Sequence, residues 1–237
     1  MSRKMFLKVT EVWNAIHGCQ HRCIYCWAER LVKTRLRNSA RYKHGFDYAV
    51  EPEELDRKFK PGGLVFVTDM GDLFGSWVPK YMIDITMENI RANAKTNFLL
   101  QTKNPERYVG LLSSNGEYFP ENVYLGATIE SNRDYPLLSK APSQHFRYGF
   151  MGSPLLKPYR IFVSIEPILD FDLDDMLKWM NSLHPSVIEI GADNYKNNLP
   201  EPSWDKVEQL TKSLRDICPE VNLKPGLDRL IEGKNNG

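Results

Sequence analysis

The stretch that decides the fold is WNAIHGCQHRCIYCWAER, residues 13–30, which leads from a predicted strand through a cysteine-rich loop into a predicted helix. Cys19, Cys23 and Cys26 have the spacing C-x3-C-x2-C, whereas Cys218 lies far along the chain. Three cysteines so close together are typical of a metal site in a reducing compartment, not of a disulfide framework. We therefore expect a cytoplasmic protein with a metal site, in which Cys218 is a buried structural residue.

Seven short apolar runs recur along the chain, and several are apolar on consecutive residues, as parallel strands covered on both faces are. The runs are Leu7–Trp13, Leu64–Thr68, Phe98–Thr102, Val123–Thr128, Ile161–Ile165, Val187–Ile190 and Val221–Leu223.

Helical patterns separate these runs. Apolar residues recur every three or four positions over 173–183 and over 204–217, with Asp172 and Ser203 as candidate caps. Pro79 can begin a further helix. Alternating strands and helices predict an α/β fold, a partial (β/α) barrel of about six βα units. We expect one domain over residues 1–237, with a disordered tail over 232–237.

Polar side chains follow almost every predicted strand, where (β/α) barrels carry their chemistry. These residues are Asn14, Asp69, Lys103, Glu130, Glu166, Asp193 and Lys224. Residues 38–61 and 139–158 resemble insertions and are interpreted as lids or substrate loops.

Charge is balanced overall, with 31 basic and 30 acidic residues, so net charge indicates no polyanionic partner. Residues 30–44, however, contain six basic residues and no acidic one. This segment is either a solvated helix face and loop or a phosphate-facing patch. No apolar run approaches the roughly 20 residues of a membrane span, so no membrane partner is expected.

The cysteine loop, with Tyr25 as the aromatic residue before Cys26, resembles that of the radical SAM superfamily. The resemblance implies a 4Fe–4S cluster on Cys19, Cys23 and Cys26, with an open iron that binds S-adenosylmethionine (SAM). Reductive cleavage of SAM then yields a 5′-deoxyadenosyl radical, which removes hydrogen from the substrate. It also implies a partial barrel of radical SAM type and a reducing partner such as flavodoxin or ferredoxin.

The same resemblance implies six contacts with SAM: Tyr25, Gly71, Asp72, Glu130, Asp193 and Asn194. Tyr25 would pack near the adenine, and Glu130 would accept hydrogen bonds from the ribose. Gly71 and Asp72 stand where the superfamily has a Gly-Gly-Glu-like turn for the amino group. This chain departs from that turn, with one glycine and an aspartate.

Across residues 8–230 the chain resembles a phage-associated radical SAM-like family of unknown function, and its cysteine loop is similar to that of spore photoproduct lyase relatives, which act on DNA. The blocks that carry the likeness are the cysteine loop, MGDLF at 70–74, QTKNPER at 101–107, NVYLGATIE at 122–130 and FVSIEPIL at 162–169.

Three functions stay open at this point. The first is a radical SAM enzyme acting on a nucleobase or nucleic acid, and its candidate substrate contacts are Lys103, Glu166, Arg35, Arg37 and Arg41. The second is a radical SAM enzyme acting on a small molecule or a peptide. The third is a zinc-stabilised nucleic-acid-binding module, in which His17 or His21 completes a Cys3His site.

Overall fold

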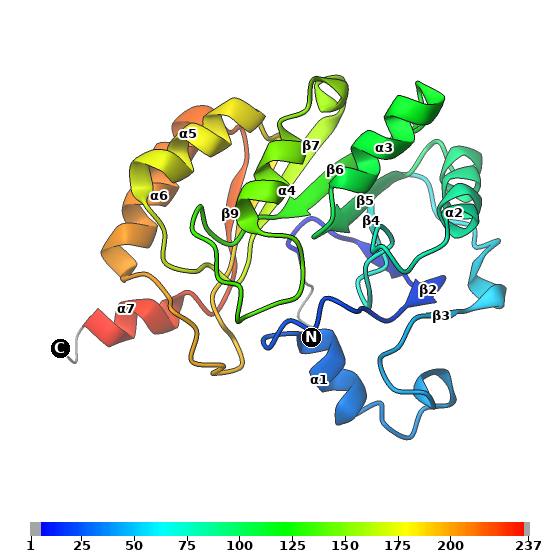
Figure 1. The fold of residues 1–237 in the computed structure, drawn as a ribbon, viewed down its shortest axis with the longest axis horizontal. Coiled ribbons are helices and arrows are strands. Elements are labelled where there is room, and N and C mark those ends of the chain that lie inside the picture. Colours follow the sequence, from blue (N-terminus) through cyan, green and yellow to red (C-terminus); the bar gives the residue numbers. More distant parts are fainter. Residues whose placement is uncertain (1–5, 235–237) are drawn as a thin grey trace.

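The computed structural model describes residues 6–234 and contains one curved sheet of seven parallel strands, in the order β1-β4-β5-β6-β7-β8-β9 (Figure 1). The strands are β1 Glu11–Trp13, β4 Leu64–Val67, β5 Asn97–Thr102, β6 Val123–Thr128, β7 Arg160–Ile165, β8 Val187–Ile190 and β9 Val221–Leu223. The predicted partial (β/α) barrel is therefore confirmed. The first strand is shorter than predicted, because it begins at Glu11.

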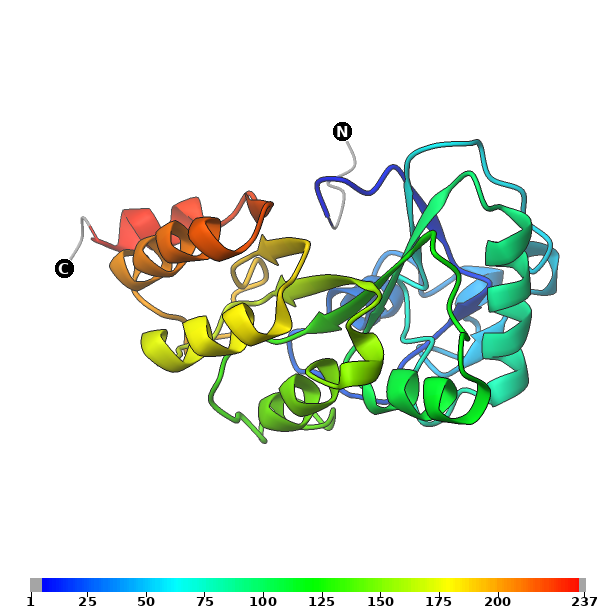
Figure 2. The same ribbon diagram turned by 90° about the horizontal axis from the view of Figure 1, so that it is seen from above.

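A helix follows each of these strands. The helices are α1 Trp27–Lys33, α2 Lys80–Ala92, α3 Glu106–Asn115, α4 Gln144–Met151, α5 Leu173–Leu183, α6 Trp204–Ile217 and α7 Asp228–Lys234. Figures 1 and 2 show α2 to α6 along the outer side of the curved sheet. The apolar stripes of α5 and α6 are buried there, as their spacing predicts.

The inner side of the half-barrel is filled by an apolar cluster at its N-terminal end. Phe6 is fully buried, and its ring centroid lies 5.2 Å from that of Phe66 on β4 and 5.0 Å from that of Phe162 on β7. Toward the C-terminal ends of the strands, the inward-facing residues are Gln101 on β5 and Ser164 on β7, which is two residues past Phe162. The interior is thus closed below by aromatic rings and becomes polar toward the C-terminal ends of the strands.

Two short strands outside the main sheet join the cysteine loop to a distant segment. β2 Ile16–His17 pairs antiparallel with β3 Ala49–Val50. One 3-10 helix, Ala40–Tyr42, precedes β3, and another, Pro52–Glu54, follows it. Residues 38–61, predicted to be a lid or a substrate loop, therefore form part of the support of the cysteine loop.

The chain departs from two other expectations. Residues 139–158 were expected to be an insertion, but they contain α4 and the 3-10 helix Pro154–Leu156 and so complete a regular βα unit. The expected tail over 232–237 begins inside α7, which extends to Lys234, and residues 235–237 lie outside the described residues. Within residues 6–234, no helix is long and apolar enough to cross a membrane.

Candidate functional site

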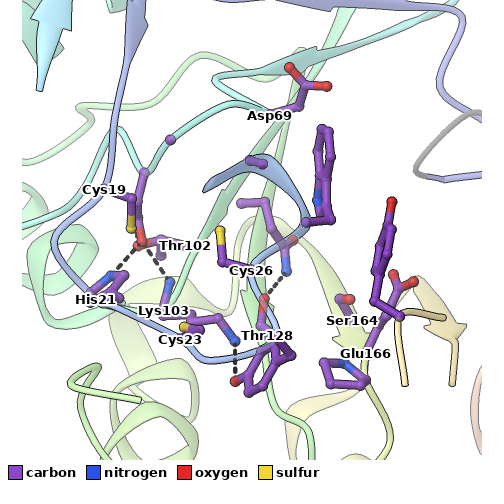
Figure 3. Close-up of a pocket in the computed structure, with 18 of the residues that line it drawn as sticks. Cys19, His21, Cys23, Cys26, Asp69, Thr102, Lys103, Thr128, Ser164 and Glu166 are labelled. Carbon is purple, nitrogen blue, oxygen red and sulfur yellow. Dashed lines mark hydrogen bonds and ion pairs between the residues drawn. The ribbon is translucent and has the colours of Figure 1, made fainter. Parts of the chain in front are cut away.

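A cavity opens at the C-terminal ends of the strands, beneath the cysteine loop. Its volume, including the solvent at its mouth, is about 950 Å³. Cys19, Cys23 and Cys26 all line it. Figure 3 shows these three cysteines on one side of the cavity and Ser164 and Glu166 on the other.

The three thiols come from a loop whose last cysteine starts a helix. Cys26 is the N-cap of α1, and its sulfur accepts a hydrogen bond of 3.3 Å from the amide of Glu29. Cys23 Sγ lies 3.0 Å from Ser139 Oγ. Burial raises the pKa of Cys26 to about 11 and that of Cys19 further. Cys19 and Cys26 therefore hold their protons in this environment, and bound metal would supply the positive charge that stabilises their thiolates.

The histidines near these cysteines lie beside carboxylates. His17 Nδ1 lies 3.2 Å from Glu51 Oε1, and burial lowers the pKa of His17 to about 4. His21 Nε2 lies 2.9 Å from Asp72 Oδ2. Within residues 6–234, no group of three or more His, Cys, Asp or Glu side chains could hold a single metal ion.

Gly71 and Asp72 tie the cysteine loop to the sheet. Gly71 forms a parallel β-bridge with Gly18, and a Cβ at position 71 would lie 2.8 Å from the carbonyl oxygen of Gly18. A glycine is required there because two backbones approach so closely.

The carboxylate of Asp72 is buried and surrounded by four contacts. They are His21 Nε2, the Phe74 amide, the Thr102 hydroxyl and the Lys103 amide, all within 2.7–2.9 Å. Burial alone would raise the pKa of Asp72, but His21 and these hydrogen bonds hold it below its ordinary value. Both residues of this turn line the cavity, although the oxygens of Asp72 are already engaged by the protein.

Glu130 occupies a fully buried position and does not line the cavity. Its Oε1 accepts hydrogen bonds from Tyr25 at 2.7 Å and from Lys103, and its Oε2 accepts from Gln144 and Arg147, each at 2.6 Å. Burial opposes ionisation, but Arg147 and Lys103 outweigh it and lower the pKa of Glu130 to about 2. Glu130 thus connects the cysteine loop with Lys103, just past β5, and with α4, and its contact with ribose stays a prediction.

Asp193 and Asn194 follow β8 and line the cavity. The Asp193 carboxylate accepts hydrogen bonds from the amide of Tyr195 at 3.1 Å and from the side-chain amide of Asn197 at 2.6 Å. Asp193 therefore shapes the loop, whereas Asn194 is exposed at the cavity.

The five candidate substrate contacts fall into separate groups. Lys103 and Glu166 line the cavity, and Glu166 Oε2 forms an ion pair of 2.5 Å with Lys224. Arg35 and Arg37 are exposed on the segment after α1, outside the cavity lining. Arg41, in contrast, is half-buried. Its Nε lies 3.1 Å from Glu51 Oε1, and its Nη2 donates a hydrogen bond to the Asn14 carbonyl oxygen. These contacts hold the Arg41 side chain against the protein, and its contact with a substrate stays a prediction.

Several polar residues of the site were missed in the sequence. Gln101, Thr128 and Ser164 line the cavity from β5, β6 and β7, and Arg147 reaches Glu130 from α4. The sequence feature that could have identified the three strand residues is a single polar residue on the inward face of an otherwise apolar strand.

The sequence matches, over residues 7–218, the family described as "Protein of unknown function (DUF5131)". The chain belongs to this family. A search of curated proteins gives no match.

Solved structures with the same fold include three variants of spore photoproduct lyase. A cysteine-to-serine variant has a TM-score of 0.60 at 9% identity, covering 93% of this chain and 80% of that chain. A tyrosine-to-phenylalanine variant has a TM-score of 0.59 at 10% identity, covering 91% and 76%.

The third, a double variant with bound AdoMet and dinucleoside spore photoproduct, has a TM-score of 0.54 at 10% identity, covering 88% and 61%. The chain thus spans about three fifths of that lyase. At this identity the likeness shows a shared fold.

Proposed function

We propose that this protein is a radical SAM enzyme whose Cys19, Cys23 and Cys26 hold a 4Fe–4S cluster with one iron open for SAM. The observation that carries the proposal is the arrangement of thiols: three of them face one cavity at the C-terminal ends of a half-barrel, and the nearby histidines are turned to carboxylates. Three protein ligands coordinate three of the four irons of a cubane cluster. The fourth iron keeps an open coordination position, as catalytic metal sites do for an exchangeable ligand.

The fold supports the same assignment. The solved structures of this architecture include one of spore photoproduct lyase with bound AdoMet and dinucleoside spore photoproduct. When bound, such a cluster supplies the electron for reductive cleavage of SAM. A reducing protein such as flavodoxin or ferredoxin would deliver that electron. The residues of this chain hold the loop in place, line the cavity and exclude water from it.

A nucleobase or a nucleic acid is the proposed substrate. Two observations favour it over a peptide or a metabolite: the dinucleoside bound to the structural neighbour, and two exposed arginines, Arg35 and Arg37, on the segment that follows the helix starting at Cys26. Cations beside a cavity can contact the phosphates of a polynucleotide.

Anaerobic reconstitution tests the enzyme class. The purified chain is loaded with iron and sulfide, reduced with dithionite and incubated with SAM, and 5′-deoxyadenosine is measured by chromatography. We expect a broad charge-transfer absorption band and production of 5′-deoxyadenosine. The matched control is Cys218→Ala, which removes the cysteine outside the cavity and should leave both signals unchanged. A colourless protein that retains stoichiometric zinc would contradict the proposal.

A further inference from the structure

Four polar side chains form the bottom of the cavity, and we refer to Gln101, Thr128, Ser164 and Glu166 as the polar floor. They lie on or just past three adjacent strands: Thr128 on β6 is paired in register with Ser164 on β7, and Gln101 on β5 is paired with Gly126 on β6. The layer beneath them is aromatic and aliphatic. A barrel interior normally continues with branched apolar side chains at this level, so packing alone does not call for a polar layer.

The polar floor has hydrogen-bonding capacity that the described part of the protein does not use. Gln101 Nε2 donates to Thr128 Oγ1 at 3.1 Å, which leaves the hydroxyl proton of Thr128 to donate elsewhere. The other end of the Gln101 carboxamide, Oε1, is buried and has no partner within residues 6–234. An unsatisfied buried acceptor costs roughly 1–3 kcal/mol, so a bound group that donates to it would recover that energy.

Two glycines make room for this layer. A Cβ on Gly126 would lie 2.0 Å from Gln101 Oε1, and a Cβ on Gly191 would lie 2.7 Å from Glu166 Oε1. Neither glycine has a positive φ, so the backbone does not require glycine at these positions. Glycine inside a strand usually weakens it or marks a close approach. Here both glycines leave space for polar side chains at the cavity.

We propose that the polar floor binds the edge of a nucleobase that carries adjacent N–H and carbonyl groups. The ring N–H would donate to Gln101 Oε1 or to the Glu166 carboxylate, and the carbonyl would accept from the hydroxyls of Thr128 and Ser164. Phe66, which also lines the cavity, offers an apolar ring beside this edge. This inference rests on the proposed function and specifies its substrate: uracil, thymine and guanine present such an edge, whereas adenine and cytosine present an amino group beside an unprotonated ring nitrogen.

Calorimetric binding to the cluster-loaded protein tests the inference. The probes are uridine, thymidine, guanosine, adenosine and cytidine, followed by single-stranded hexanucleotides that differ in one central base. We expect the keto bases to bind at least tenfold more tightly than adenine and cytosine. Gln101→Leu should reduce that affinity about tenfold or more, because a hydrogen bond of this kind decides between bases.

Two further variants separate recognition from folding. Gly126→Ala should act like Gln101→Leu, because the added methyl group displaces the carboxamide without changing its chemistry. Thr86→Val is the matched control, since it removes a buried hydroxyl that bonds only within α2, to the Met82 carbonyl oxygen, and it should leave binding unchanged. If Gly126→Ala fails to fold, Ser164→Ala provides the second test.

The outcomes distinguish this inference from the proposed function. If the wild-type protein cleaves SAM but binds no base, or binds all five equally, the floor is not a base-recognition site. If Gln101→Leu lowers the affinity for SAM and leaves base binding unchanged, the floor belongs to the cofactor and the inference is overturned. A failure of SAM cleavage in the wild-type protein would instead count against the enzyme class.

Discussion

The hydroxyl of Tyr25, one residue before the last cysteine of the loop, donates a hydrogen bond of 2.7 Å to Glu130 just past β6. Through Glu130, the loop is joined to Lys103 at the end of β5 and to Arg147 on α4. The position of the thiols over the cavity therefore depends on a buried charge cluster as well as on the loop's own backbone.

Replacing Glu130 should destabilise the protein strongly. Glu130→Gln leaves the buried Arg147 and the half-buried Lys103 without a counter-charge, and breaking a buried pair typically costs about 3–5 kcal/mol. Urea unfolding measures this change. Asp175→Asn, which breaks an exposed ion pair with Lys178 on α5, should cost less than about 1 kcal/mol. Equal effects of the two substitutions would show that the Glu130 cluster is not a brace.

Two substitutions of Cys26 should separate its roles as ligand and as helix cap. Cys26→Ala should lose the cluster absorption and also lower stability by about 1 kcal/mol, since the amide of Glu29 loses its acceptor. Cys26→Ser should lose the cluster as well but retain the cap, so its apoprotein should melt close to the wild-type apoprotein. Retention of a full-strength cluster in Cys26→Ala would refute the ligand assignment.

Gly71→Ala should disturb the cysteine loop, because its Cβ would lie 2.8 Å from the Gly18 carbonyl oxygen. We expect a loss of stability of about 1–3 kcal/mol, as in other overpacked sites, together with weaker cluster retention. Gly110→Ala on α3 has open space around its Cβ and should be neutral or stabilising by up to about 1 kcal/mol. Thermal melting with iron analysis compares the two, and intact iron loading in Gly71→Ala would contradict the close-approach argument.

Glu189 on β8 should make stability depend on pH. Burial raises the pKa of Glu189 to about 7, against the attraction of Lys224. The folded state therefore binds the proton more tightly than the unfolded state does. This contribution is fully present below about pH 4.5 and is lost as pH rises through about 7.

Its size is on the order of 3 kcal/mol. Glu189→Gln should remove the slope between those pH values in urea unfolding curves and raise stability at pH 8. A slope that is identical in the variant would assign the pH dependence to other groups, such as Glu166, whose pKa is also raised by burial.

Arg35 and Arg37 should govern the salt dependence of polynucleotide binding. Neutralising both should weaken binding of all sequences alike and flatten the plot of log affinity against log salt by up to about two units. Lys212→Gln with Arg215→Gln removes two charges from α6 and is the matched control. Fluorescence anisotropy at several salt concentrations measures both, and an unchanged slope in the Arg35 and Arg37 variant would exclude this segment from the binding surface.

Local patterns were enough to predict the strands, the amphipathic helices and the cysteine loop. Runs of consecutive apolar residues mark strands that are buried on both faces, and the stripes of α5 and α6 follow from helical periodicity, because both depend only on neighbours in the chain. The same holds for the spacing of Cys19, Cys23 and Cys26, since all three lie in one short loop.

Only the tertiary structure decided which charges meet. Arg147 lies in a segment that reads as an insertion, yet α4 carries it to Glu130, while the pairing of β2 with β3 brings Glu51 beside Arg41. Burial then sets the chemistry, because a carboxylate or a carboxamide in a low-dielectric interior depends on the few groups that the fold places around it. Chain spacing does not encode those neighbours, which come from elements that are distant in sequence and adjacent in the barrel.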